Sequence, residues 1–110
     1  MDRRSSWLKG VLDLLVLATL VRDESYGYEI AKTLAGSGFG RIRGGTLYPV
    51  LNRLEESGLV AAEFRAAEKG PGRRYYRITD GGLATLREQA GLWLDFDASV
   101  RDILTQGGMP

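Results

Sequence analysis

A proline stands inside a segment whose apolar residues recur as they do in an α-helix. Residues 44 to 59 read GGTLYPVLNRLEESGL, and four apolar side chains fall at i, i+3, i+4 and i+7, namely Leu47, Val50, Leu51 and Leu54. Because proline in a helix interior costs about 3 kcal/mol, a helix here has to begin just before Pro49. With Thr46 as the N-cap, Pro49 falls in the first turn, where backbone N–H groups have no partner within the helix. We predict a helix over residues 46 to 57 that ends at Gly58 in a left-handed conformation.

Two further helices are predicted before this one. Residues 6 to 21 are apolar almost all round, which indicates a buried first helix with Ser5 or Ser6 as its N-cap. A second helix is expected to begin near Ser25 and to be stopped by the glycines at positions 36, 38 and 40. The first half of the chain therefore predicts three short helices in succession.

The spacing of apolar residues changes after Leu59. Residues 60 to 66 and 74 to 78 read as two strands around the turn-rich sequence EKGPGR, which predicts a β-hairpin with a basic tip. A long helix with Thr79 as its cap is expected over residues 79 to 104, and residues 105 to 110 are expected to be a disordered tail. The predicted fold class is α+β and mainly α. It comprises a winged helix-turn-helix domain over residues 1 to 78, followed by a long C-terminal helix that mediates dimerisation.

The composition argues against several functional classes. The chain has 110 residues with no cysteine and no histidine, so disulfides, zinc sites of the usual ligands and Ser/His or Cys/His nucleophile pairs are excluded. We predict a protein that is not an enzyme and that uses no cofactor and no metal. The apolar run near the N-terminus is interrupted by Asp13 and is far shorter than a membrane span, so we expect a soluble cytoplasmic protein without membrane contact.

The charges are unevenly distributed along the chain. The net charge is +1, but residues 41 to 77 carry eight basic and four acidic side chains, whereas residues 78 to 110 carry two and five. A positive middle segment suits contact with a polyanion, although a charged run is often only a solvated face.

The predicted third helix and wing carry residues suited to duplex DNA. On the helix, Asn52 can pair with adenine, Arg53 with guanine or phosphate, and Thr46 and Tyr48 with phosphate or a thymine methyl. At the wing, the expected DNA-binding residues are Lys69, Gly70, Arg73 and Arg74, with Gly70 and Gly72 allowing close approach of the backbone. Asn52 and Arg53 could equally be ordinary surface residues, and one of Tyr75 and Tyr76 is expected to belong to the core.

Three motifs resemble the PadR family of winged-helix transcriptional regulators. They are YGYEI at 26 to 30, GTLYPVLNRLEESGLV at 45 to 60 and GPGRRYYRITDGG at 70 to 82. The resemblance implies a homodimeric transcription factor, commonly a repressor, that binds a partly palindromic operator through two recognition helices and two wings. It also implies that Tyr26 joins the DNA contacts.

The single C-terminal helix resembles the compact branch of the family, which includes the lactococcal multidrug regulator. That resemblance implies a pore at the dimer centre where a planar aromatic effector stacks, lined here by Trp7, Gly10, Leu14, Ala90, Trp93 and Asp97. Ala90 departs from the branch, where a bulkier aromatic residue would narrow the pore. Packing of the dimer alone is the alternative role for Trp93, and Asp97 could be merely solvated or bonded to an arginine.

An apolar stripe on the long helix predicts contact with another helix. The residues expected at the dimer interface are Leu83, Leu86, Trp93, Phe96, Val100 and Leu104. The combined pattern predicts a sequence-specific DNA-binding regulator, released from DNA by a ligand at the dimer interface. The alternative is a winged-helix adaptor that binds another protein and neither binds DNA nor senses a ligand.

Overall fold

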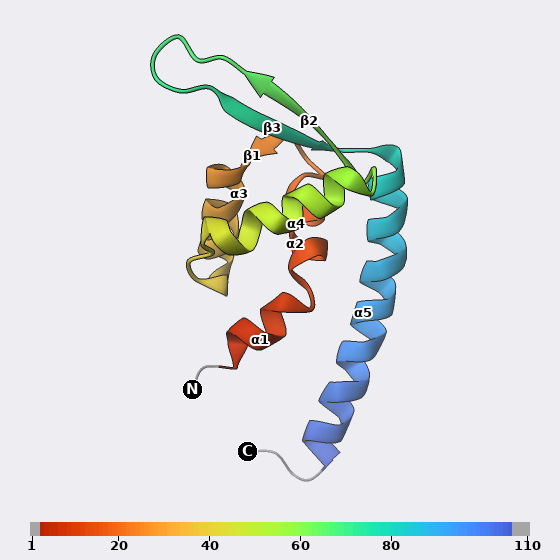
Figure 1. The fold of residues 1–110 in the computed structure, drawn as a ribbon. Helices are drawn as coiled ribbons and strands as arrows, with labels where there is room; N and C mark the ends of the chain where they lie inside the picture. The colour runs from red at the N-terminus through yellow and green to blue at the C-terminus, as the bar shows by residue number, and fades with distance from the viewer. Residues whose placement is uncertain (1–2, 107–110) are drawn as a thin grey trace.

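The computed structural model, which describes residues 3–106, is mainly helical with a small antiparallel sheet (Figure 1). In chain order the elements are α1 Arg4–Lys9, α2 Leu12–Thr19, β1 Ser25–Tyr26, α3 Gly27–Leu34, the π-helical turn η1 Ala35–Phe39, α4 Gly44–Glu56, β2 Val60–Arg65, β3 Arg73–Ile78 and α5 Asp80–Gln106. The β2–β3 hairpin projects from one end of the molecule, and α5 extends from its root along the opposite side. The predicted fold class, a winged helix-turn-helix with a long C-terminal helix, is confirmed.

The core lies among α2, α3, α4 and the sheet. The predicted apolar face of α4 is buried, and Leu47 retains only 1% of its exposure. It packs in one cluster with Val16 and Leu17 of α2, Ile30 of α3 and Tyr76 of β3. Full burial of a leucine side chain contributes about 1.5–3 kcal/mol, so this face fixes the orientation of α4 and leaves its opposite side to solvent.

The predicted start of α4 is wrong by two residues. The helix begins at Gly44, and the Arg43 carbonyl accepts hydrogen bonds from the N–H groups of Thr46 and Leu47, both at 3.0 Å. Arg43 occupies the N-cap position without a side-chain capping bond, so Thr46 is not the cap. The error arises because Gly44 and Gly45, usually read as helix breakers, adopt helical geometry here.

Pro49 consequently lies in the second turn of α4, as its sixth residue. Proline has no N–H group, so the Gly45 carbonyl does not receive the α-helical bond that residue 49 would otherwise donate. The expectation that Pro49 costs the helix no hydrogen bond is therefore wrong. The absence of a Cβ at Gly45 eases the approach of the proline ring to the preceding turn.

We expect Pro49→Ala to raise the free energy of unfolding by about 1–3 kcal/mol, because alanine restores a donor to the Gly45 carbonyl and removes the ring. Urea unfolding followed by circular dichroism measures this change. A variant with unchanged or lower stability would show that the ring is accommodated without cost.

The predicted first helix is interrupted. Val11, with φ −131° and ψ −2°, separates α1 from α2, and α1 begins at Arg4 rather than after a Ser5 or Ser6 cap. α2 is buried beneath α3, α4 and α5, whereas α1 has no buried residue and Trp7 is 67% exposed. The prediction that the whole segment is buried is therefore wrong for α1, which lies outside the body of the domain (Figure 1).

The second helix begins at Gly27, because Ser25 and Tyr26 form β1 instead. This short strand pairs with β3 through Ser25↔Tyr76 and Tyr26↔Tyr75 and gives the strand order β1-β3-β2. The glycine stop is confirmed, since Gly38 and Gly40 adopt positive φ values of 100° and 73°. The two predicted hairpin strands agree with β2 and β3 to within one residue at each end.

Thr79 joins the wing to α5 as predicted. Gly82 N–H donates to the Thr79 hydroxyl oxygen at 3.0 Å, which caps α5, and the same hydroxyl donates to the Gly58 carbonyl at 2.7 Å. Gly58 has the predicted left-handed conformation, with φ 74°. α5 includes residues 105 and 106, two beyond the expected end, and the remainder of the predicted tail, 107 to 110, lies outside the described residues. Over residues 3–106, no helix combines the length and hydropathy needed to cross a membrane.

Candidate nucleic-acid interface

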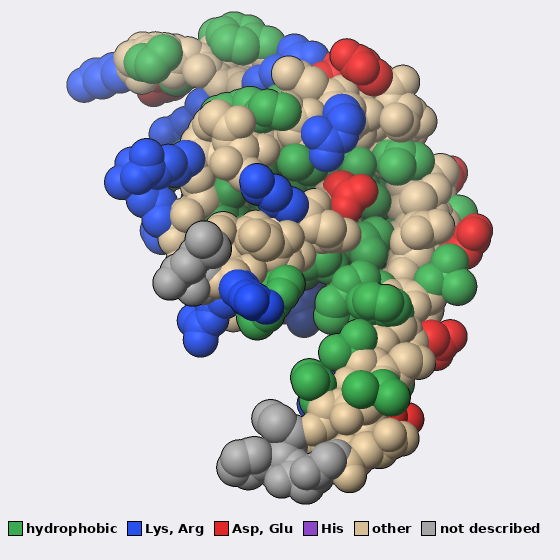
Figure 2. Space-filling view, turned by 60° about the horizontal axis from the view of Figure 1, so that its bottom comes forward, with side chains coloured by type: hydrophobic (Ala, Val, Ile, Leu, Met, Phe, Trp, Pro, Cys, Tyr) green, Lys and Arg blue, Asp and Glu red, His purple; other side chains and the backbone are tan. Residues whose placement is uncertain are grey.

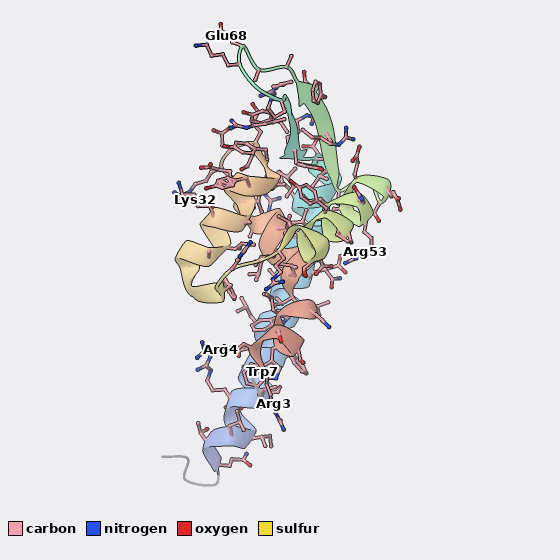
Figure 3. The ribbon with its side chains drawn as sticks, turned by 60° about the vertical axis from the view of Figure 1, so that its left-hand side comes forward. Arg3, Arg4, Trp7, Lys32, Arg53 and Glu68 are labelled. Carbon is pink, nitrogen blue, oxygen red and sulfur yellow. The ribbon has the colours of Figure 1, made fainter. Side chains whose placement is uncertain are left out.

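The exposed side of α4 carries the polar residues predicted to contact DNA. Thr46, Tyr48, Asn52 and Arg53 are all exposed, on the side opposite the buried leucines. Figure 3 shows Arg53 on the outer surface of α4, away from the sheet. The structure thus presents one continuous polar helix face to solvent.

The Tyr48 ring occupies a defined position near the start of this face. A Cβ atom on Gly27 would lie 2.5 Å from the Tyr48 hydroxyl oxygen, and one on Gly44 would lie 3.3 Å from the ring. The ring therefore lies between the beginnings of α3 and α4, yet it remains 48% exposed. No role was predicted for Gly27, although it is the central residue of the YGY motif.

Four of the predicted DNA-binding residues border one surface depression of about 420 Å³. It lies between the starts of α3, α4 and β3, and its lining residues are Tyr26, Gly27, Tyr28, Tyr48, Gly72, Arg73 and Arg74. Two guanidinium groups beside tyrosine hydroxyls can donate several hydrogen bonds to a phosphate. The geometry of this depression is suited to a nucleic-acid backbone.

Arg74 already has a carboxylate partner. Its guanidinium donates to Glu55 of α4 at 2.6 Å, and this hydrogen bond raises the pKa of Arg74 above its ordinary value. The ion pair links the wing to α4, so a phosphate would have to compete with Glu55 for this arginine. The neighbouring Tyr76 is the core tyrosine of the pair, with 2% exposure, and burial raises its pKa.

The outer part of the wing places Lys69 and Gly70 at its turn. Both residues are exposed, and Gly70 has a φ of 81°, which favours glycine. Glu68, labelled at the far end of the wing in Figure 3, reduces the positive charge there. Gly72 has a packing role that was not predicted, because a Cβ at this position would lie 2.3 Å from the Phe64 ring and 2.6 Å from the Arg65 carbonyl oxygen.

The outer face of the sheet carries a charged and aromatic cluster that was not predicted from the sequence. Arg65 donates to both carboxylate oxygens of Glu24, at 2.6 and 2.7 Å. This bidentate bond lowers the pKa of Glu24 and raises that of Arg65. The Arg65 guanidinium also lies over the Tyr75 ring, at 4.4 Å from its centroid. The alternation of charged and aromatic residues on one face of β3 was the available signal, but the partners come from Glu24, β1 and β2.

Further basic residues are exposed before α4 and on α3. Arg41 and Arg43 are exposed immediately before α4, and Lys32 is exposed on α3 (Figure 3). Blue side chains gather over one side of the domain in Figure 2. Arg41 and Arg43 belong to the segment 41 to 77, whose positive balance was noted, whereas Lys32 lies outside it.

The predicted ligand-binding residues do not form a single site within one chain. Gly10, Leu14 and Trp93 line a groove of about 420 Å³ between α2 and α5, which also contains Asp13 and Gln89. Trp7 borders a different depression, between α1 and η1, together with Phe39. Ala90 and Asp97 line neither, and Asp97 accepts a hydrogen bond from Arg101 at 3.0 Å.

The predicted interface residues on α5 divide into two groups. Leu83 and Leu86 are half-buried near the start of the helix, where Leu86 packs against the core of its own chain. Farther along, the exposed apolar side chains are Trp93, Phe96, Val100 and Leu104, joined by Leu92, Leu94 and Ile103. Figure 2 shows hydrophobic side chains along the concave side of α5 and acidic ones along its outer edge.

The sequence matches the model of the transcriptional regulator PadR-like family over residues 16–88, from α2 into the first part of α5. The chain belongs to the PadR family. It is therefore a PadR-like transcriptional regulator, and this class of protein is not an enzyme class.

Individual relatives and solved structures support the same assignment. The transcriptional regulator Rv3488 of Mycobacterium tuberculosis is 38% identical over 80 residues, which cover 73% of each chain. A PadR family regulator from Eggerthella lenta superimposes with a TM-score of 0.82 at 40% identity, covering 91% of this chain and 87% of the other. A PadR-like regulator from Bacillus cereus gives a TM-score of 0.79 at 36% identity, with coverage of 91% and 97%.

Proposed function

We propose that this PadR protein acts as a cytoplasmic homodimer that binds duplex DNA and represses transcription. The observation that carries the proposal is the continuity of the exposed polar face of α4 with the arginine-lined depression at the start of β3. A single DNA duplex can meet both surfaces if α4 enters a major groove and the wing follows the adjacent backbone.

Base and backbone contacts are divided between the two surfaces. Asn52 and Arg53 lie on the exposed side of α4, where their side chains can read base edges. Tyr48, Lys69 and Arg73 supply donors for phosphates, which fix the register of the helix on the duplex.

The second subunit of the proposed homodimer would cover the exposed apolar side of α5. Phe96 is 64% exposed, and Val100 and Leu104 lie on the same helix with little cover from their own chain. A large exposed apolar face of this kind favours association. A homodimer would present two α4 helices to half-sites centred about 34–36 Å apart.

An effector at the dimer helices would control the separation of the two α4 helices. The groove that contains Gly10, Leu14 and Trp93 offers an aromatic surface to a planar ligand, and Asp13 rather than Asp97 supplies its carboxylate. If ligand binding weakens DNA binding by some factor, DNA binding weakens ligand binding by the same factor.

A gel-shift titration with duplex from the chain's own promoter region tests DNA binding. We expect the wild type to shift the duplex and both Tyr48→Ala and Lys69→Ala to bind more weakly. If both variants bound DNA as tightly as the wild type, α4 and the wing would not be the DNA-binding surface. Complete absence of a shift, together with a protein partner bound independently of salt, would favour an adaptor.

Titration with planar aromatic compounds, followed by tryptophan fluorescence, tests the effector site. We expect quenching in the wild type that is lost in Trp93→Ala and retained in Trp7→Phe, because only Trp93 lines the groove with Gly10 and Leu14. An unchanged signal across a broad panel of compounds would leave Trp93 with a packing role.

A further inference from the structure

A chain of side-chain contacts crosses the outer face of the sheet from Glu24 to Arg73. Glu24 holds Arg65 of β2 through two hydrogen bonds, and Arg65 lies over the ring of Tyr75 on β3. The Tyr75 ring meets Tyr26 of β1 edge to face, with centroids 5.4 Å apart and an interplanar angle of 63°. The Arg73 guanidinium lies over the other end of this series, 4.4 Å from the centroid of the Tyr26 ring.

The contacts of Arg73 differ from those of Arg65 and Arg74, two other arginines of the hairpin. Arg65 and Arg74 each form an ion pair with a carboxylate, at 2.6 Å in both cases. Within residues 3–106, no carboxylate oxygen lies within 4.0 Å of the Arg73 guanidinium nitrogens. A tyrosine ring orients a guanidinium without neutralising its charge, so Arg73 keeps its full attraction for a phosphate.

The ring of Tyr26 contributes more to this arrangement than its hydroxyl does. Among the residues that the structure describes, the hydroxyl makes one long hydrogen bond, 3.4 Å to Glu29 in the first turn of α3. Both ring contacts are close, and Tyr26 and Arg73 border the same depression as Tyr48. The family resemblance implies that Tyr26 contacts DNA, and these ring contacts suggest that it also acts through Arg73.

We propose that Tyr26 is a positioning residue, which holds the Arg73 guanidinium toward a DNA phosphate and is itself fixed by Tyr75, Arg65 and Glu24. This inference rests on the proposed DNA-binding function and assigns a residue that acts through another. The arrangement reduces the side-chain freedom that Arg73 loses when it binds DNA.

A double-mutant cycle on DNA affinity tests the proposal. The Kd for a fluorescent duplex is measured at low salt for the wild type, Tyr26→Leu, Arg73→Ala and the double variant. Any duplex sequence suffices, because a phosphate contact is independent of base sequence. Thermal unfolding of each variant confirms that differences in Kd do not reflect loss of the fold.

We expect Tyr26→Leu to weaken binding about two- to fivefold in the wild-type background and to have no further effect in Arg73→Ala. Tyr26→Phe, which retains the ring, should bind as the wild type does. Arg73→Ala should also make the slope of log K against log salt less steep by about 0.9, the value for one phosphate contact on duplex DNA.

Two results would overturn the proposal while leaving DNA binding intact. One is that Tyr26→Leu weakens DNA affinity equally in the wild-type and Arg73→Ala backgrounds, which would give Tyr26 an independent role. The other is an equal loss from Tyr26→Phe and Tyr26→Leu, which would make the hydroxyl the contact. If the wild type fails to bind duplex DNA even at low salt, the proposed function itself is overturned.

Discussion

Gly82→Ala is expected to destabilise the domain by about 3 kcal/mol or more, enough to unfold a large fraction of a marginally stable protein. Gly82 is buried where α5 leaves the sheet, and a Cβ atom there would lie 2.1 Å from the Leu59 carbonyl oxygen and 2.7 Å from Ile78 Cγ1. The carbonyl belongs to the backbone, so rotation of a side chain cannot relieve the clash. The same Gly82 N–H donates to Thr79 in the cap of α5, and moving the helix away would break that bond. Urea unfolding followed by circular dichroism measures the effect.

Two other glycines of α5 serve as matched controls. A Cβ on Gly81 would lie no closer than 3.7 Å to its neighbours, and one on Gly91 would meet nothing within 4 Å. Alanine at either position should raise the free energy of unfolding by about 0.5–1 kcal/mol, because it favours the helix. If Gly82→Ala were as stable as these controls, the close packing of α5 on the 58–59 turn would be incorrect.

Gly27→Ala is expected to weaken DNA binding by roughly tenfold or more with little loss of stability. The added methyl group would lie 2.5 Å from the Tyr48 hydroxyl oxygen, so the tyrosine ring has to move out of its position between α3 and α4. The ring is an exposed side chain and can rotate into solvent, which is why the fold should tolerate the change. A hydrogen bond to a charged phosphate contributes about 1.5–3 kcal/mol, and its loss gives the expected change in Kd. Fluorescence anisotropy with an operator duplex measures this change.

A double variant separates loss of Tyr48 from other effects of the methyl group. Gly27→Ala combined with Tyr48→Ala should bind DNA as weakly as Tyr48→Ala alone, because no ring remains to be displaced. Gly36→Ala, where the methyl group meets nothing within 4 Å, should bind as the wild type does. Additive losses in the double variant would argue that Gly27 acts independently of Tyr48.

The features predicted correctly from the sequence depend on short stretches of chain. The spacing of Leu47, Val50 and Leu51 predicted the buried face of α4, and Thr79 was identified as the cap of α5 from its local context. Gly58 was predicted to be left-handed because it directly follows the expected end of the helix at Ser57. In each case the sequence signal lies within a few residues of the one predicted.

The features that were missed depend on contacts between distant segments. β1 has only two residues and exists because β3, some fifty positions later, supplies its partner. The contact between Tyr48 and Gly27 and the ion pair between Arg74 and Glu55 likewise join different elements. The break at Val11 and the helical geometry of Gly44 went unpredicted because apolar spacing alone does not determine where a helix starts or bends. The sequence therefore predicted most of the elements and of the α4 face, but not the contacts that hold the side chains of the site.

The most direct test of DNA binding by α4 and the wing is the salt dependence of duplex affinity, compared between the wild type and Lys69→Ala. We predict that log K for the wild type falls steeply and linearly with log salt. Lys69→Ala should reduce that slope by about 0.9, the value for one phosphate contact on duplex DNA. An affinity that does not change with salt, or no detectable binding at low salt, would contradict the proposed function.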